Sequence, residues 1–202
     1  MPKKQIDYTQ KIQTMDKEKL NRVLIAAIKE FAKGYKQAST DVIVREAGIA
    51  KGLLFHYFGS KKNLFFYLHE YAQKRVIFEY FNIIELKQRD ILERWRQMSK
   101  VRIELLRSYP SIWEFINNAN ADEKDEAIRE TSRNKMAFFQ EAYTRLFNDI
   151  DYTLFRDDLN VHRALDIIVF TMESYSNTGI SEDEFIKGVN DYIRLLRKCF
   201  YK

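Results

Sequence analysis

The stretch that decides the fold reads Ser39-Thr40-Asp41-Val42-Ile43-Val44-Arg45-Glu46-Ala47-Gly48-Ile49-Ala50-Lys51-Gly52-Leu53-Leu54-Phe55-His56-Tyr57-Phe58-Gly59-Ser60-Lys61-Lys62-Asn63-Leu64. Gly48 permits a tight turn between two short helices, because glycine adopts a positive φ without steric cost. Apolar residues at helical spacing are expected to hold these helices together: Ile43, Ala47, Leu54 and Phe58. Basic, hydroxyl-bearing and aromatic residues remain on the outside. The pattern predicts a helix-turn-helix whose second helix enters a DNA major groove.

The segment before this motif is expected to supply a supporting helix. Asp16 is a candidate N-cap, an apolar stripe follows at spacings of three and four, and Gly34 is expected to end the helix. Residues 1–15 carry lysines but show no clear period. Two interpretations of them stay open, a frayed terminus and a basic arm that touches DNA.

The distribution of charge agrees with a nucleic-acid partner for the N-terminal part. Residues 1–62 hold 13 Lys/Arg against 6 Asp/Glu, a net charge of +7, whereas residues 63–202 hold 21 against 23, a net charge of −2. The basic excess of the chain, +5 overall, therefore lies in the segment that contains the motif. Attraction to phosphate requires such an excess, although a basic solvated face is also common.

Composition predicts a globular, all-α protein. Of 202 residues, 46% are hydrophobic and 31% are charged, and only 2 prolines and 6 glycines interrupt long stretches of helical period. The lone Cys199 excludes an intramolecular disulfide framework and suits a reducing cytosol. Neither an apolar signal region at the start nor a run near the roughly 18 residues of a membrane span is present. We therefore expect a cytoplasmic protein.

Residues 48–64 resemble the signature of the tetracycline-repressor (TetR/AcrR-type) family of transcriptional regulators. That pattern runs Gly, aliphatic, small, Lys, Gly, any residue, Leu, Tyr, any residue, Tyr or His, Phe, and then Ser-Lys with an apolar residue. The resemblance covers about residues 17–68. It implies an N-terminal three-helix DNA-binding domain, expected over residues 1–62, and a C-terminal helical ligand-binding and dimerisation domain, expected over residues 63–202.

The resemblance also assigns DNA contacts to individual residues. Lys51 and Gly52 resemble base-edge contacts, because lysine favours guanine O6 and N7 and glycine lets the backbone approach closely. Phe55 resembles an aromatic that touches a base edge or a thymine methyl. The full set expected to bind DNA comprises Thr40, Lys51, Gly52, Leu53, Phe55, Tyr57, Lys61 and Lys62. Tyr57 and Lys61 resemble phosphate contacts, the latter aided by a helix N-terminus.

Three residues depart from the family pattern. Phe55 replaces the usual tyrosine and lacks its hydroxyl, and Val44 replaces a tightly packed alanine. Asp41 places a carboxylate where a neutral or basic residue is frequent, so it suits the helix dipole but repels nearby phosphate. These departures affect the list of contacts rather than the motif.

The C-terminal part is expected to contain further amphipathic helices over residues 63–81, 86–108, 111–118, about 120–150, about 165–179 and 181–200, with a loop at residues 151–160. Aromatic residues are candidates to line a pocket for an apolar or aromatic effector: Trp95, Tyr109, Trp113, Phe139, Tyr143, Phe170 and Tyr175. Ordinary core packing is the alternative interpretation. The resemblance further implies a dimer interface on the last two helices, with these candidates: Leu165, Ile168, Val169, Met172, Val189, Tyr192, Ile193 and Leu196.

Residues for enzymatic chemistry do not form a recognisable constellation. The glycines match neither a dinucleotide fingerprint nor a phosphate loop, and His56, His69 and His162 are scattered. A single cysteine near the C-terminus gives no metal cluster. We therefore expect no catalytic activity, no cofactor and no metal.

These observations predict a DNA-binding transcriptional regulator, most simply a repressor. A homodimer would bind a near-palindromic operator, and a small apolar or aromatic effector would release it. The alternative is a DNA-bound scaffold on the same fold that recruits a protein partner without a small molecule.

Overall fold

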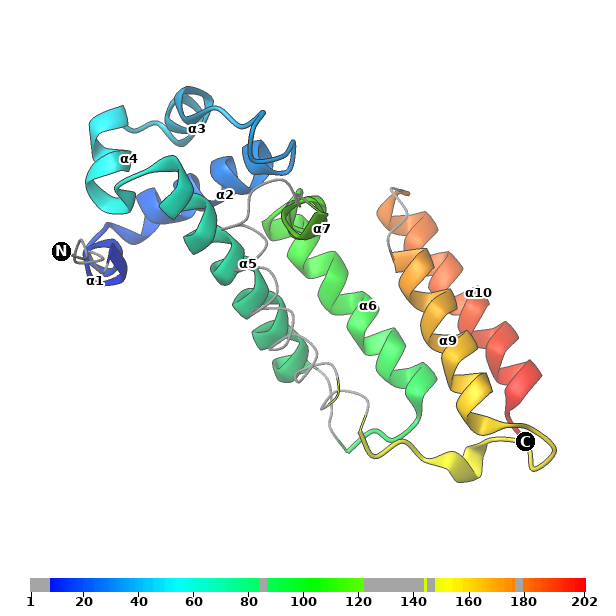
Figure 1. Cartoon of the computed structure of the whole chain (residues 1–202). Coiled ribbons are helices and arrows are strands. Elements are labelled where there is room, and N and C mark those ends of the chain that lie inside the picture. The colour runs from blue at the N-terminus through cyan, green and yellow to red at the C-terminus, as the bar shows by residue number, and fades with distance from the viewer. Residues whose placement is uncertain (1–7, 84–86, 122–143, 145–147, 177–179) are drawn as a thin grey trace. The chain divides into compact units, whose positions relative to one another are not determined.

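The computed structural model describes residues 8–83, 87–121, 144, 148–176 and 180–202 (Figure 1). Within these residues the secondary structure is helical apart from an isolated β-bridge, which agrees with the predicted all-α class. The elements in chain order are α1 (Tyr8–Gln13), α2 (Lys17–Phe31), α3 (Thr40–Ala47), α4 (Lys51–Phe58), α5 (Lys61–Ile83), α6 (Ile91–Ser108), α7 (Ile112–Ala121), the 3₁₀ turn η1 (Tyr152–Leu154), α9 (Val161–Ser176) and α10 (Glu182–Phe200).

The chain divides into two compact units. Unit 1 comprises Met1–Val76 and Leu106–Phe139, and unit 2 comprises Ile77–Leu105 and Gln140–Lys202. Both α5 and α6 therefore contribute residues to each unit. Unit 1 is larger than the expected DNA-binding segment 1–62, because the start of α5 and the α6–α7 turn pack with the helix-turn-helix. The functional division near residue 62 remains a prediction.

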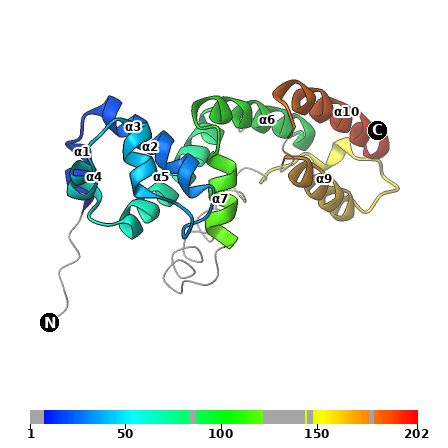
Figure 2. The ribbon, with the colours of Figure 1, turned by 90° about the horizontal axis from the view of Figure 1, so that it is seen from above.

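Unit 1 is built on α2. The predicted N-cap is confirmed, since Asp16 Oδ1 accepts the Lys19 N–H at 3.0 Å. The apolar stripe of α2 is buried, and the helix packs against α3 and α7. α3 ends at Gly48, whose φ of +66° produces the turn into α4. α1 packs against the far side of α4, where the two views in Figures 1 and 2 place it.

Two predicted helix ends differ in detail from the structure. α2 ends at Phe31, and Gly34 adopts a φ of +104° three residues later, in the turn that leads to α3. Ser39 lies at the N-cap position of α3, but its side chain makes no capping hydrogen bond. Instead, the Ser39 backbone N–H donates to the buried Glu30 carboxylate at 3.0 Å. A side chain from α2 thus replaces the expected local cap.

The predicted cap of α5 is confirmed. Ser60 Oγ accepts the Asn63 N–H at 3.1 Å, and the helix continues without interruption to Ile83. Its first part joins the core of unit 1 through Leu64, Phe65 and Leu68. An edge-to-face contact between Phe31 and Phe65, with ring centroids 5.3 Å apart, links α5 to α2.

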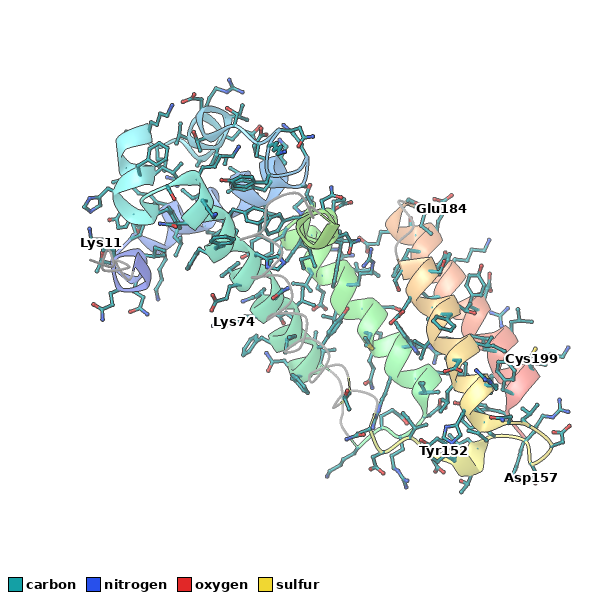
Figure 3. The ribbon with its side chains drawn as sticks, viewed as in Figure 1. Lys11, Lys74, Tyr152, Asp157, Glu184 and Cys199 are labelled. Atoms are coloured by element: carbon teal, nitrogen blue, oxygen red, sulfur yellow. The ribbon has the colours of Figure 1, made fainter. Side chains whose placement is uncertain are left out.

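Unit 2 packs α6, α9 and α10 around one apolar core, and Figure 1 shows α9 and α10 side by side. The predicted capping box of α10 is confirmed by reciprocal bonds between Ser181 and Glu184, the latter labelled in Figure 3. Gly188 lets α9 approach closely, because a Cβ there would lie 1.8 Å from the Tyr175 hydroxyl oxygen. That hydroxyl donates to the Glu184 carbonyl at 3.0 Å.

The predicted loop 151–160 contains more structure than expected. It includes η1 and an antiparallel bridge between Phe155 and Tyr201. Tyr201 also donates to Asp90 Oδ1 at 2.7 Å, and Arg197 pairs with Asp90 Oδ2 at 2.8 Å. Burial and these partners raise the pKa of Tyr201 well above its ordinary value, so its hydroxyl stays protonated.

Other helices of the C-terminal part agree with prediction apart from their ends. α6 begins at Ile91 rather than near Leu86, because Asp90 Oδ1 accepts the Leu92 N–H at 2.9 Å. α9 begins at Val161, before the expected stripe. The helix expected over about 120–150, with its Asn120–Glu123 capping box, lies largely outside the described residues. None of the described helices is long and apolar enough to cross a membrane.

Candidate nucleic-acid interface

The recognition helix α4 separates a buried side from an exposed one. Leu54 and Phe58, four residues apart, are each 1% exposed and join the core of unit 1, as predicted. Lys51 and Gly52 are exposed, and Leu53, Phe55 and Tyr57 are partly exposed. All five α4 residues of the predicted DNA-binding set therefore lie at least partly at the surface.

Gly52 is exposed for a reason that the fold does not supply. Its φ is not in the left-handed region, and a Cβ at this position would meet no heavy atom within 4 Å. Glycine lowers the stability of a helix by roughly 0.5–1 kcal/mol relative to alanine. Neither backbone geometry nor internal packing of the chain therefore requires a glycine here.

Lys51 is paired across the turn. Its Nζ lies 2.7 Å from Asp41 Oδ1 in the first turn of α3, and both side chains are more than half exposed. The carboxylate that departs from the family pattern thus lies beside the lysine expected to contact a base. Sequence reasoning identified both residues but not their contact.

The two lysines at the start of α5 lean on aromatic rings. Lys61 Nζ lies 4.8 Å from the centroid of the Tyr35 ring, and Lys62 Nζ lies 5.7 Å from that of Phe66. Burial lowers the pKa of Lys61, and the charge of Glu30 partly opposes this shift. The rings hold both ammonium groups beside the N-terminus of α5, where backbone N–H groups favour an anion.

Glu30 is a residue of this surface that sequence reasoning missed. Its side chain is 5% exposed, accepts the Ser39 N–H and pairs with Lys33. It thereby positions the first turn of α3, where the predicted contact Thr40 is partly exposed. Glutamate in the apolar stripe of α2 was the only available signal, because its partner Ser39 is nine residues away.

A family model described as bacterial regulatory proteins, tetR family, matches residues 23–68. This segment contains α3, α4 and most of α2, and it ends within α5. The chain belongs to the tetR family of transcriptional regulators. The family is one of DNA-binding regulators, in agreement with the sequence-based prediction. No match is found among curated proteins.

Solved structures of tetR-type regulators share the fold of this tetR-family chain. A regulator from Chloroflexus aurantiacus superposes with a TM-score of 0.61 at 18% identity, covering 96% of this chain and 98% of its own. A ketosteroid transcriptional regulator of Mycobacterium tuberculosis gives 0.58 at 16% identity, covering 94% and 97%. FadR from Bacillus subtilis, solved in complex with stearoyl-CoA, gives 0.55 at 17% identity, covering 87% and 96%.

The predicted effector-binding aromatics of this tetR-family chain are spread over both units. Tyr109 and Trp113 belong to unit 1, and Tyr109 bonds to the Tyr71 hydroxyl at 2.7 Å. Trp95 is 4% exposed in the core of unit 2, whereas Phe170 is 70% exposed on α9. Phe139 and Tyr143 lie outside the described residues. Tyr175 stacks on Phe185 within unit 2, with ring centroids 5.6 Å apart.

The predicted dimer residues of this chain lie mostly in its own core. Five of them are at most 6% exposed: Ile168, Met172, Val189, Ile193 and Leu196. Leu165, Val169 and Tyr192 are partly buried against the same core. The helical period was interpreted correctly, but the apolar stripe faces inward. Large apolar side chains that are exposed on α9 and α10 are Ile167, Phe170, Ile186 and Leu195.

Metal-binding geometry is not found in the part of the chain that the structure describes. No three His, Cys, Asp or Glu side chains come together there as a metal site requires. Cys199 is exposed on α10 (Figure 3).

Proposed function

We propose that the chain is a repressor whose homodimer places two α4 helices in successive major grooves of a near-palindromic operator in the cytoplasm. The observation that carries the proposal is the open space around Gly52. A glycine that the fold does not need, on the exposed side of a recognition helix, indicates that another molecule approaches the backbone there. Lys51 at the preceding position supplies a donor for guanine O6 and N7.

Substitution of Gly52 by alanine separates folding from DNA binding. The added methyl has room within the chain, so Gly52→Ala should leave the free energy of unfolding unchanged or raise it by up to about 1 kcal/mol. It should weaken operator binding about tenfold or more, the loss expected when a base contact of about 1–3 kcal/mol is prevented. The operator is first obtained by selection of bound duplexes from random DNA.

The matched control is His56→Ala, an exposed position on the same helix outside the predicted contact set. His56→Ala should retain operator affinity within about twofold. An alanine at position 52 that left operator affinity unchanged would show that α4 does not approach DNA through this surface, and the proposal would be wrong.

The proposed effector is apolar, of the long-chain acyl type. FadR of Bacillus subtilis was solved with stearoyl-CoA, and a fatty acid degradation regulator of Bacillus halodurans shares the fold with a TM-score of 0.62 at 16% identity. Twenty-nine aromatic residues, obtained from 15 Phe, 12 Tyr and 2 Trp, supply ample apolar surface for such a ligand.

Stearoyl-CoA, stearate and coenzyme A alone form a matched series of probes. If the acyl chain is the recognised group, the first two should raise the thermal midpoint and lower operator affinity, and coenzyme A should do neither. A ligand shifts the equilibrium only through its differential affinity for the DNA-binding and DNA-free forms. Full operator affinity at saturating acyl ligand would exclude this effector class and favour a scaffold without an effector.

We further propose that the dimer uses the outer sides of α9 and α10 rather than the stripe predicted from sequence. Ile167 and Phe170, three residues apart on α9, are 49% and 70% exposed, and Leu195 on α10 is 56% exposed. Side chains three apart on a helix are surface neighbours. Apolar groups at these positions are available to a second copy because they do not take part in the core.

A further inference from the structure

The surface proposed to meet DNA carries an acidic side chain. Asp41 lies in the first turn of α3, and its Oδ1 lies 2.7 Å from Lys51 Nζ at the start of α4. The side chains are 69% and 51% exposed, so the pair lies in solvent and not within the core. A cation at the leading end of the recognition helix is thereby partly neutralised before DNA is bound.

Stability of the fold does not account for this arrangement. A carboxylate in the first turn of α3 interacts favourably with the helix dipole wherever its side chain points. The connection of α3 to its neighbours already has a separate ion pair, Lys29 Nζ to Glu46 Oε2 at 3.1 Å. An exposed pair of the Asp41–Lys51 kind changes a folding equilibrium by about fivefold at most.

We propose that Asp41 is a specificity-determining residue of DNA binding. On an arbitrary sequence the pair stays closed, because a diffuse phosphate field offers Lys51 no acceptor at a fixed place, and the carboxylate repels the backbone. On the operator, a base edge with two acceptors withdraws the ammonium group from Asp41. The residue therefore lowers affinity for non-specific DNA more than affinity for the operator. This inference rests on the proposed function.

The weakness of the pair is what allows it to discriminate. A closed pair worth about fivefold is overcome by a good base contact, which discriminates by roughly 5- to 150-fold. It is comparable with what one extra phosphate contact contributes at moderate salt. Freeing Lys51 should therefore add about one cation to the non-specific complex and steepen its slope of log K against log salt by about 0.9.

Asp41→Asn in the full-length protein tests the inference. The affinities for the selected operator and for a scrambled duplex of equal length and composition are measured from 50 to 300 mM salt. Asp41→Asn should strengthen binding to the scrambled duplex about fivefold, alter operator binding less than twofold, and so lower the specificity ratio about fivefold. Thermal unfolding of each variant establishes that it is folded at the temperature of the binding measurement.

Glu46→Gln is the matched control, because it removes the same charge from the same helix at a residue paired with Lys29 rather than Lys51. It should leave the specificity ratio unchanged. In a Lys51→Met background, Asp41→Asn should no longer alter that ratio. An equal effect of both neutral variants, or an undiminished effect without Lys51, would reduce the role of Asp41 to general charge and overturn the inference.

Failure of the inference differs from failure of the proposed function. A wild-type protein that prefers no DNA sequence overturns both. A wild-type protein that binds a selected operator, with the same specificity ratio in Asp41→Asn, overturns only the role assigned to Asp41.

Discussion

Glu30 shows how a single buried carboxylate positions the DNA-facing surface. Burial alone would raise its pKa, but hydrogen bonds from Lys33 and from the Ser39 N–H, with the charges of Lys33 and Lys29, hold that pKa below its ordinary value of 4.5. A lowered pKa means that the ionised form stabilises the folded state. This stabilisation is present above about pH 4.5 and is lost as the pH falls through the lowered pKa of the folded protein.

Replacement of Glu30 should therefore have a pH-dependent effect on stability. Glu30→Gln keeps an oxygen that accepts the Ser39 N–H but loses the charge, so the free energy of unfolding should fall by about 1–2 kcal/mol at pH 7. The difference from wild type should shrink as the pH is lowered below 4.5, because only the wild-type residue titrates. Urea unfolding at pH 7, 5 and 4 measures it.

The exposed Glu46 supplies the comparison for that experiment. Glu46→Gln breaks the ion pair with Lys29 and should cost about 0.5 kcal/mol or less at every pH. A Glu30→Gln penalty that stayed constant from pH 7 to pH 4 would show that the lost charge is not its cause.

At the scale of the elements, sequence reasoning succeeded where the signals are local. The caps at Asp16, Ser60 and Ser181 and the turn at Gly48 each depend on residues within about four positions, and all are present. The orientation of a stripe depends on what covers it, which periodicity does not reveal. Ile168 and Ile193 were therefore interpreted as an interface although they are core residues.

The exposed side of α9 gives the test of dimerisation. Phe170→Glu should convert a dimer into a monomer in sedimentation equilibrium, because a carboxylate would be buried without a partner. Its midpoint of thermal unfolding as a monomer should change little, since Phe170 is 70% exposed. Phe78→Glu, at a residue of α5 that is 57% exposed, is the control and should remain dimeric. Dimers in both variants would place the interface elsewhere.

At the scale of the whole molecule, the sequence predicted two functional parts, and the structure shows two compact units with different limits. α5 and α6 contribute to both units, so neither part is separated from the other by a linker within these helices. Composition indicated where the charge changes sign, near residue 62, but contacts between distant segments determine the limits of a compact unit. The packing of Phe115 from α7 against Phe65, at 5.7 Å between ring centroids, is such a contact.

A two-part molecule that binds DNA as a dimer should show this in its salt dependence. Two α4 helices neutralise twice as many phosphates as one, and the slope of log K against log salt is about −0.9 per phosphate neutralised. The slope of the Phe170→Glu monomer on a half-site should therefore be about half that of the wild type on the full operator. Equal slopes would mean that one subunit makes all the phosphate contacts.

The open space at Gly52 also has a practical consequence for protein engineering. Because no other part of the chain packs against that position, a library of side chains there samples new DNA sequences without repacking the hydrophobic core. Most biosensor redesigns alter recognition and expression level together. Variation at this one codon would change the promoter that is controlled while the sensing half of the regulator is left intact.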